Sequence, residues 1–485
     1  MPVQGWRPSL SGDLDRSPDV PHGPLSDLVP DVEAEAARQA FEALAGADPS
    51  PDAAARRRHL RALRAAVRDM AEPLAAALDA DFGGRPRVET MAAEVGLVLA
   101  VADWTLRRLG RWMRPERVRL PMEFLGAKGR VERVPLGCVG IIGPWNYPVQ
   151  LSLVPLVAAL AGGNRVILKP SEWTPRTSSL LAGIVSRAVP DRVRVVQGGP
   201  DVASALTALP LDGLFFTGST TTGRRVAEAA ARNLVPVTLE LGGKSPAILL
   251  PDADLSEAAL SVMAGKLFSA GQTCVAPDYL LVPRTRMGET VEALKAATRR
   301  LYPDPDGPDY AAILRPQDRA RLEDLLRGQQ VVPLMERMPK APKLGAWAVL
   351  DPDLESPAMR EEIFGPVLPL VPYDDLAGAE AFANARPVPL AAYAFGRDVA
   401  ACEGVLGRVR SGGAVVNDCI THVAAHPLPF GGAGESGMGA YHGEEGFRAF
   451  TRPRSLMVAS RWSPVRMVRP PHGARVERIV RLLLR

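Results

Sequence analysis

The stretch CVGIIGPWNYPVQLSLVPLVAALAGGNRVILKPSE, residues 138–172, decides the fold. It holds a short apolar run, a longer apolar segment that ends in Gly-Gly-Asn, and a second short apolar run. Short runs bounded by Gly and Pro are typical of buried strands, and the longer segment is typical of a buried helix. This succession of strand, helix and strand indicates two parallel strands joined by a helical crossover.

The same alternation continues downstream to residue 240. We expect its strands at 138–143, 165–168, 193–196, 213–216 and 235–239. We expect its helices near 148–162, 176–189, 200–209 and 223–232. The series predicts a Rossmann-like, doubly wound parallel sheet, and ligands bind such sheets beyond the carboxyl ends of the strands.

Further elements lie on both sides of this region. A second α/β series predicts another α/β domain, with strands at 247–250, 279–282, 311–314, 367–371, 390–395 and 414–417. Upstream, residues 31–114 show helical spacing of apolar side chains. The runs 118–124 and 130–134 flank a Gly-containing turn at 126–129 and predict a hairpin. The fold class that we expect is α/β, with two α/β domains and a small β arm for subunit contact.

Composition bounds the function. The 485 residues are 47% hydrophobic and 23% charged, which excludes a largely disordered chain and a polytopic membrane protein. The net charge of +4 is small for this length and gives no nucleic-acid signature. The four cysteines form no C-x-x-C pair, so we expect reduced thiols in a cytoplasmic protein. Residues 1–30 contain no apolar segment typical of a secretory signal.

Two motifs follow predicted strands of the first sheet and suit a dinucleotide. Gly218 to Gly223 reads Gly-Ser-Thr-Thr-Thr-Gly and opens a helix, whose free N–H groups can bind a phosphate. A turn before any helix would look similar, so this motif is weak alone. Lys169 and Glu172 follow another strand, where they can meet ribose hydroxyls. The alternative for that pair is an ordinary surface turn.

Two further positions suit covalent chemistry. Glu240 ends a predicted strand beside two glycines, where a carboxylate can act as a general base, the alternative being a loop cap. Cys274 ends the sequence Gly-Gln-Thr-Cys, which follows an apolar helical segment and can expose a thiol. A lone cysteine is usually a small buried hydrophobe, but one on a loop is a better nucleophile candidate.

Together, and in this order, several blocks resemble the aldehyde dehydrogenase family. The matching blocks are 144–148, 169–172, 216–220, 240–246, 271–274, 362–366 and 429–432. Their succession covers roughly residues 33–457 and is highly specific. Residues 272–279 and 436–443 resemble the class 3 branch. Within it, residues 81–83, 111–115 and 416–423 are similar to bacterial coniferyl aldehyde dehydrogenases.

The resemblance implies a mechanism. Cys274 would attack the aldehyde to give a thiohemiacetal, and hydride transfer to a nicotinamide would leave a thioester. Glu240 would activate the water that hydrolyses this thioester. The side-chain amide of Asn146 and the main-chain N–H of Cys274 would hold the oxyanion. We therefore expect an oxidoreductase that converts an aldehyde to its acid.

The resemblance also implies the cofactor contacts. Lys169 and Glu172 would hold the adenosine ribose, and Glu362 would hold the nicotinamide ribose. The full expected set is Trp145, Lys169, Glu172, Gly218, Ser219, Gly223, Glu362 and Phe364, with Gly218, Ser219 and Gly223 flanking the pyrophosphate and Phe364 on the nicotinamide ring. A carboxylate near the ribose disfavours a 2′-phosphate. We expect NAD, with NADP possible.

Other interpretations stay open. The expected substrate is an aromatic or hydrophobic aldehyde similar to coniferaldehyde, and a fatty or medium-chain aldehyde is the alternative. An acylating enzyme would want no water-activating base, so Glu240 argues against it. A catalytically inactive binding or structural relative would lack Cys274, Glu240 or Asn146, and all three are present.

Partners and boundaries complete the expectations. We expect a homodimer, no metal site and no nucleic acid. An Arg-spaced helix within 475–485 suits a membrane surface, but we expect it to pack on protein, without membrane association. The expected segments are a flexible arm at 1–30, an NAD-binding domain at 31–117 and 136–240, oligomerisation segments at 118–135 and 426–460, a catalytic domain at 241–425 and a basic tail at 461–485.

Overall fold

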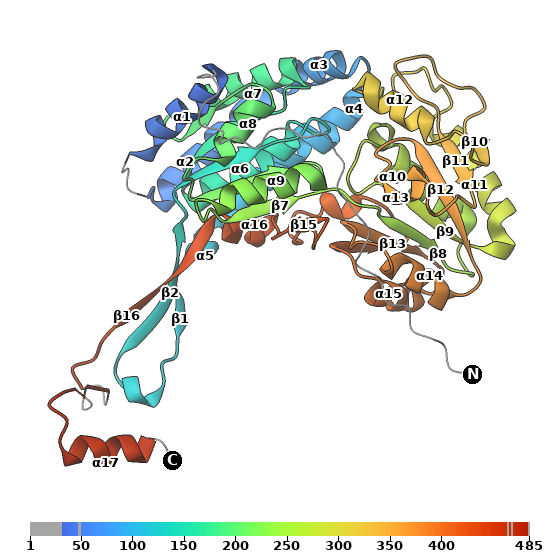
Figure 1. The fold of residues 1–485 in the computed structure, drawn as a ribbon. Coiled ribbons are helices and arrows are strands. Elements are labelled where there is room, and N and C mark those ends of the chain that lie inside the picture. Colours follow the sequence, from blue (N-terminus) through green and yellow to red (C-terminus); the bar gives the residue numbers. More distant parts are fainter. Residues whose placement is uncertain (1–31, 47–49, 463–464, 467–468, 484–485) are drawn as a thin grey trace, which may run out of the picture.

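The computed structural model describes residues 32–46, 50–462, 465–466 and 469–483. The N-terminal arm predicted at residues 1–30 therefore lies outside the described residues. Two α/β lobes lie side by side, and a long β arm projects from the first lobe (Figure 1). The predicted fold class, two α/β domains with a β arm, is confirmed.

The first lobe contains a six-stranded sheet in the order β15-β7-β6-β3-β4-β5. Its strands are β3 (Cys138–Ile142), β4 (Arg165–Lys169), β5 (Val193–Val195), β6 (Gly213–Thr217), β7 (Val237–Glu240) and β15 (Gly437–Met438). All neighbours are parallel except the pair of β15 and β7. The chain runs from β3 through β4 to β5, then returns to β6 on the other side of β3. Strand order thus reverses beside β3, and such a switch point is where doubly wound sheets bind ligands.

Helices cover both faces of this sheet. The crossover helices are α6 (Gln150–Gly162), α7 (Pro175–Ala188), α8 (Pro200–Thr207) and α9 (Thr220–Ala231). The preceding helices are α1 (Val32–Ala45), α2 (Ala53–Asp69), α3 (Ala71–Phe82), α4 (Arg87–Glu89), the π-helix η1 (Thr90–Gly96) and α5 (Leu97–Trp112). Helix α6 is apolar all round because α2, α5 and α16 (Gly443–Ala449) pack on it from outside the sheet.

The second lobe contains a seven-stranded sheet in the order β10-β11-β12-β9-β8-β13-β14. Its strands are β8 (Pro246–Leu249), β9 (Tyr279–Pro283), β10 (Val331–Pro333), β11 (Trp347–Leu350), β12 (Val367–Tyr373), β13 (Ala391–Phe395) and β14 (Gly413–Val416). Only β10 runs antiparallel to its neighbour. Its helices are α10 (Leu255–Leu267), η3 (Phe268–Gly271), η4 (Arg284–Arg286), α11 (Met287–Leu301), α12 (Pro316–Asp324), α13 (Pro357–Arg360), α14 (Leu376–Asn384), α15 (Val399–Arg408) and η5 (Thr421–Val423).

One predicted strand of this lobe is wrong. Residues 311–314 are apolar and mostly buried, but they join no sheet. Their main chain bonds to loops and to one side chain instead: the N–H of Ala312 donates to Gly84 O, and the side chain of Gln272 bonds both Ala312 O and Leu314 N. The strand that extends the sheet beside β12 is β11, which lies in a stretch where we predicted none.

The arm is a three-stranded antiparallel sheet of β1 (Glu116–Val118), β2 (Lys128–Pro135) and β16 (Thr451–Val458). The predicted strand at 118–124 is wrong beyond residue 118, because a turn of 3-10 helix, η2 (Met122–Phe124), takes its place. Within the segment 426–460, β15 joins the first lobe's sheet and only β16 joins the arm.

The C-terminal helix α17 (Ala474–Leu483) lies beyond the far end of the arm, as Figure 1 shows. Large apolar side chains are exposed in or just after η2 and β16, namely Met122, Leu125, Met457, Val458 and Trp462. Among the helices that the structure describes, none has both the length and the apolar character that crossing a bilayer requires.

Candidate active site

The carboxyl ends of β3, β6 and β7 face the second lobe, and a cavity of about 230 Å³ lies between them and that lobe. Its lining includes eight of the predicted site residues: Trp145, Asn146, Gly218, Ser219, Glu240, Cys274, Glu362 and Phe364. Lys169, Glu172 and Gly223 do not line it. Residues from both lobes therefore bring most of the predicted site residues into one cavity.

The loop that carries Cys274 is tightly shaped. Ser269 and Ala270 have φ values of 51° and 52°, and Gly271 follows with φ 80°. Left-handed backbone is costly for residues other than glycine, so the surrounding structure must hold this turn. A Cβ at Gly271 would collide with the main chain of Gly365, which explains the glycine at that position.

Cys274 is the accessible thiol of the chain. It is partly exposed, whereas Cys138, Cys402 and Cys419 are buried. Burial of the sulfur, followed by the charges of Glu362 and Glu240, raises the pKa of Cys274. The resting protein therefore holds a thiol here, and a base must take its proton before it acts as a nucleophile.

Glu240 ends β7 and is 3% exposed. Neither of its carboxylate oxygens has a hydrogen-bond partner among the described residues. Burial raises the pKa of Glu240 well above its ordinary value. A carboxyl group with a raised pKa keeps its proton to higher pH than an ordinary glutamate does, and it can exchange that proton with a nearby water or thiol, as general acid–base chemistry requires.

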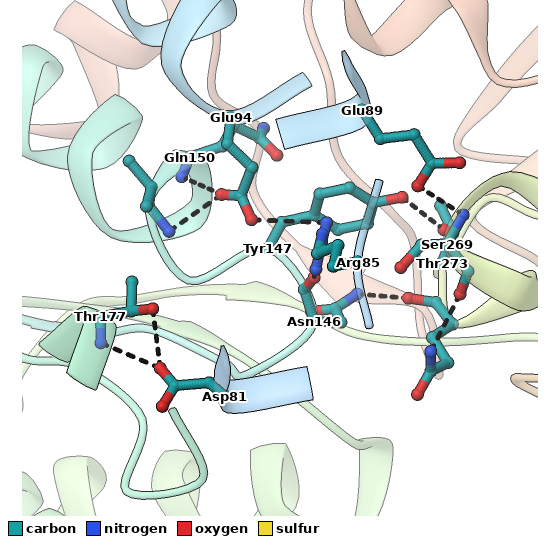
Figure 2. Close-up of polar contacts among 12 residues, drawn as sticks. Asp81, Arg85, Glu89, Glu94, Asn146, Tyr147, Gln150, Thr177, Ser269 and Thr273 are labelled. Carbon is teal, nitrogen blue, oxygen red and sulfur yellow. Dashed lines mark hydrogen bonds and ion pairs between the residues drawn. The ribbon is translucent and has the colours of Figure 1, made fainter. Parts of the chain in front are cut away.

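Asn146 and its neighbour connect the first lobe to the loop of Cys274. The side-chain amide of Asn146 donates to Gln272 O at 3.1 Å, a contact that Figure 2 shows. The hydroxyl of Tyr147 lies 2.7 Å from Thr273 Oγ1. These contacts set the amide of Asn146 beside the main chain that leads into Cys274, where it can meet an oxyanion.

The loop of Glu362 and Phe364 enters the cavity from the second lobe. The Glu362 carboxylate lies on Gly242, where a Cβ would collide with it, and burial raises the pKa of Glu362 to about 8. Phe364 has a φ of 50°, and its ring meets that of Trp145 edge-on at a centroid distance of 5.5 Å.

A buried ion pair holds the same loop from beneath. Lys244 pairs with Asp278 and also donates to two main-chain oxygens, Ala358 O at 2.9 Å and Glu361 O at 2.8 Å. The other oxygen of Asp278 accepts from Ile363 N at 2.8 Å. Glu362 is therefore positioned by the chain on both of its sides.

Lys169 and Glu172 lie at the carboxyl end of β4, and Ser219 and Gly223 lie at the start of α9. Lys169 ends β4 and pairs with Glu172 at 2.6 Å, with Lys169 buried and Glu172 partly exposed. Ser219 caps α9 by accepting from Thr222 N. Gly223 packs against Leu241, whose Cδ2 would lie 2.5 Å from a Cβ. Gly223 thus permits close packing of α9 on the next loop, and contact with a ligand is not needed to explain it.

A second cavity, of about 270 Å³, lies on the other side of Cys274 and is mainly apolar. It is lined by Ala92, Ala93, Leu97, Tyr147, Gln150, Leu151, Phe268, Thr273, Cys274, Val275, Ile420, Thr421, Val423, Ala424, Phe430 and Tyr441. Leu151, Cys274, Phe430 and Tyr441 line both cavities. The thiol thus lies between a polar cavity shared by the two lobes and an apolar cavity.

The sequence pattern of the aldehyde dehydrogenase family matches residues 28–456. The chain belongs to this family. It is similar to a probable coniferyl aldehyde dehydrogenase of Pseudomonas aeruginosa, with 43% identity over 93% of this chain and 95% of that one.

Solved aldehyde dehydrogenases share the fold. The substrate-bound AldH of Staphylococcus aureus superposes with a TM-score of 0.84 and 33% identity, over 93% of this chain and 98% of that one. A Mycobacterium tuberculosis aldehyde dehydrogenase complexed with NAD+ gives a TM-score of 0.78 and 30% identity, over 88% and 90%. This chain is therefore an oxidoreductase of the aldehyde dehydrogenase type, as predicted.

Two residues of this aldehyde dehydrogenase site, Arg315 and Tyr441, were not predicted from the sequence. Arg315 lines the polar cavity, pairs with Asp318, and lies over the rings of Trp145 and Trp173 at 5.1 and 5.3 Å. Tyr441 lines both cavities. Tyr441 stands in a Gly-rich segment that predicts close backbone approach, whereas no local signal marks Arg315.

The C-terminal histidines pack on aromatic rings. His442 stacks on Phe430 at 5.3 Å and His422 lies 5.7 Å from the same ring. Burial lowers the pKa of His422 to about 4 and that of His442 to about 3. Neutral imidazoles on aromatic faces explain both positions as packing.

Proposed function

We propose that this aldehyde dehydrogenase oxidises an aromatic aldehyde of the coniferaldehyde kind to its carboxylic acid, with NAD as the hydride acceptor. The observation that carries the proposal is the place of Cys274 between the two cavities. A substrate in the apolar cavity and a nicotinamide in the polar one would meet at this sulfur. The resemblance to coniferyl aldehyde dehydrogenases supports the choice of substrate.

The polar cavity fits a dinucleotide. The N-terminus of α9 begins at its edge, where free N–H groups suit a phosphate. Buried Glu362 suits a ribose hydroxyl, because a carboxylate accepts hydrogen bonds and its own partner here is a glycine N–H. Lys169 and Glu172 offer a donor and an acceptor for the second ribose. When bound, the nicotinamide would accept the hydride.

In the first step the Cys274 sulfur forms a bond to the aldehyde carbon, and the thiol proton passes to water or to a carboxylate. The carbonyl oxygen becomes an oxyanion, which Asn146 Nδ2 and the Cys274 N–H stabilise. Loss of hydride from the same carbon leaves a thioester on Cys274. Glu240 then takes a proton from water, whose oxygen attacks the thioester carbon. The carbon–sulfur bond breaks, the acid leaves, and the sulfur takes the proton from Glu240 to restore the thiol.

The apolar cavity favours a compact aromatic substrate. Aromatic rings border it, those of Tyr147, Phe268, Phe430 and Tyr441, and they offer flat surfaces to a substrate ring. Glu240 lines the polar cavity, and its carboxyl group favours hydrolysis of the thioester over transfer of the acyl group to coenzyme A.

Cofactor choice and assembly form part of the proposal. Glu172 would repel a 2′-phosphate, which favours NAD over NADP. The arm presents exposed apolar side chains, Met122, Leu125, Met457 and Val458 among them, and we assign it to a homodimer contact. For the other segments we propose the roles predicted from the sequence. We also propose a cytoplasmic location for the protein.

The test is NADH formation by purified protein with coniferaldehyde, benzaldehyde and a long-chain aliphatic aldehyde in parallel. The proposal expects the highest kcat/KM with coniferaldehyde, and NAD to be used better than NADP. Preference for the long chain would overturn the substrate class, and no NADH with any aldehyde would overturn the activity.

A further inference from the structure

Three charged residues lie buried behind the active site and line neither cavity. Arg85, Glu89 and Glu94 come from the segment that follows α3 and runs through α4 and η1. The side chains of Arg85 and Glu94 are both fully buried and form an ion pair, with Arg85 Nη2 3.4 Å from Glu94 Oε1. Burying charges is costly, so such a pair calls for an explanation beyond packing.

Arg85 contacts the loop of Asn146 directly. Its Nη1 donates to the main-chain oxygen of Asn146 at 2.6 Å. The guanidinium also lies over the rings of Phe82 and Tyr147, at 4.5 and 4.8 Å from their centroids. Figure 2 shows Arg85 between Glu94 and Asn146. Arg85 therefore holds both the main chain of Asn146 and the ring that follows it.

The two carboxylates hold the neighbouring main chain. Glu94 Oε2 accepts from Val149 N at 2.9 Å and from Gln150 N at 2.8 Å, where α6 begins. Glu89 Oε2 accepts from Ser269 N at 3.1 Å, in the left-handed turn that leads to Cys274. One short segment thus fixes the main chain on the Asn146 side and on the Cys274 side of the site.

We propose that Arg85 is a positioning residue for aldehyde oxidation, which acts through Asn146 and is held in place by Glu94. This inference rests on the proposed function, in which the Asn146 amide stabilises the oxyanion. The amide can point at the oxyanion only if its main chain stays in place, and Arg85 binds the carbonyl oxygen of that same residue. A displacement of about 1 Å in such a group costs roughly 100-fold in rate.

The test removes both charges together, because removing one would leave the other buried without a partner. In Arg85→Met/Glu94→Gln, the glutamine oxygen can still accept from Val149 N and Gln150 N. The matched control is Arg64→Met, which breaks another Arg–carboxylate pair, that of Arg64 with Asp103, between α2 and α5. Arg85→Lys serves as a milder variant, since a lysine keeps the charge but lacks the fork that spans both partners.

We expect kcat for NADH formation to fall about 10- to 100-fold in the double variant, with the dissociation constant for NAD within about twofold of the wild type. Arg85→Lys should lose less, and Arg64→Met should match the wild type. In an Asn146→Ala background, the same double substitution should cost less than about threefold more, because the group it positions is gone.

Full additivity with Asn146→Ala would overturn the inference, as would a wild-type kcat in the double variant. If the double variant does not fold, an unchanged kcat in Arg85→Lys overturns it. These results differ from a failure of the proposed function, which would appear as a wild type that forms no NADH from any aldehyde.

Discussion

The side-chain amide of Asn146 lies 3.1 Å from the main-chain oxygen of Gln272, two residues before Cys274. Asn146 follows β3 of the first lobe, whereas Gln272 and Cys274 follow η3 of the second. The contact therefore fixes the proposed oxyanion donor relative to the proposed nucleophile across the boundary between the lobes. Groups placed before the reaction begins need no reorganisation during it.

Replacing Asn146 by Ala should lower kcat by about 100- to 1000-fold, the usual effect of removing one oxyanion donor. The dissociation constant for NAD should stay close to that of the wild type, since this amide donates to Gln272 O and, in the proposed mechanism, to the oxyanion. Steady-state NADH formation and NAD titration by fluorescence check these two quantities. A variant that loses NAD binding as strongly as it loses kcat would assign Asn146 to the cofactor.

Glu240 should control the pH dependence of turnover. Its raised pKa means that it keeps its proton to higher pH, so the fraction able to act as a base grows as pH rises. We expect wild-type kcat to increase with pH, over a range that lies above the ordinary pKa of a glutamate. Glu240→Gln should turn over at least about 10-fold more slowly, with a weaker pH dependence. A variant with the wild-type pH profile would require another base.

Cys274 should react with iodoacetamide slowly at neutral pH. Burial and two nearby carboxyl groups raise the pKa of this thiol, so the reactive thiolate is scarce. The alkylation rate should therefore rise nearly 10-fold for each pH unit between about pH 7 and pH 9. Mass spectrometry of the Cys274 peptide follows the reaction, with Cys274→Ser as the control. A rate that is already level at pH 7 would show an activated thiolate in the resting enzyme.

A larger side chain in the apolar cavity should lower kcat/KM more for large aldehydes than for small ones. Ala93 lines this cavity from η1. In Ala93→Phe, kcat/KM should fall at least about 10-fold for coniferaldehyde, because the added ring occupies the space of the substrate ring. Propanal, which needs little of the cavity, should change less than about threefold. Equal losses for both aldehydes would show that the aromatic part binds elsewhere.

His442 should make the protein less stable in acid. Its folded pKa is lowered to about 3, so the folded state resists protonation that the unfolded chain accepts below the ordinary value of 6.5. Its contribution is present above pH 6.5 and is lost as pH falls, by up to about 1.4 kcal/mol for each unit. Denaturant titrations at pH 7 and pH 5 should show a smaller difference in His442→Phe than in the wild type.

Comparing the wild type with His442→Phe separates the effect of His442 on stability from pH effects of opposite sign. The pKa of Glu89 and of Glu94 is raised to about 7, so their contribution is full below 4.5 and is lost as pH rises through 7. Both carboxyl groups are present in the wild type and in His442→Phe. The same loss of stability between pH 7 and pH 5 in both proteins would contradict the assignment to His442.

Local patterns predict the parallel sheets because buried parallel strands read as short apolar runs between Gly and Pro. The same signal gives a wrong strand at 311–314. Its apolar side chains are buried, but the side chain of Gln272 forms hydrogen bonds to two main-chain groups of this segment. Burial is visible in the sequence, but the partner of a main-chain group is not. The strand β11 shows the converse, a sheet position taken by a run that looks unremarkable locally.

The site residues also fall into those that local motifs reveal and those that only long-range contacts reveal. Cys274, Glu240 and Asn146 stand in motifs whose order along the chain identifies the family. Arg85 stands in a segment that reads as an ordinary helix end, and its contact with Asn146 spans 61 positions. Residues proposed to touch the reacting atoms can be predicted from motifs, whereas those proposed to hold them in place depend on long-range packing.

The most direct test of the account is mass spectrometry of Glu240→Gln after mixing with NAD and coniferaldehyde. Hydride transfer should proceed while hydrolysis is slow, so a thioester should accumulate on the peptide that contains Cys274. We expect the Cys274 peptide to carry the added mass of the acyl group. We expect no adduct when NAD is omitted, and none after treatment with hydroxylamine, which cleaves thioesters. An acyl group on a different residue, or none on Cys274 although NADH is formed, would contradict it.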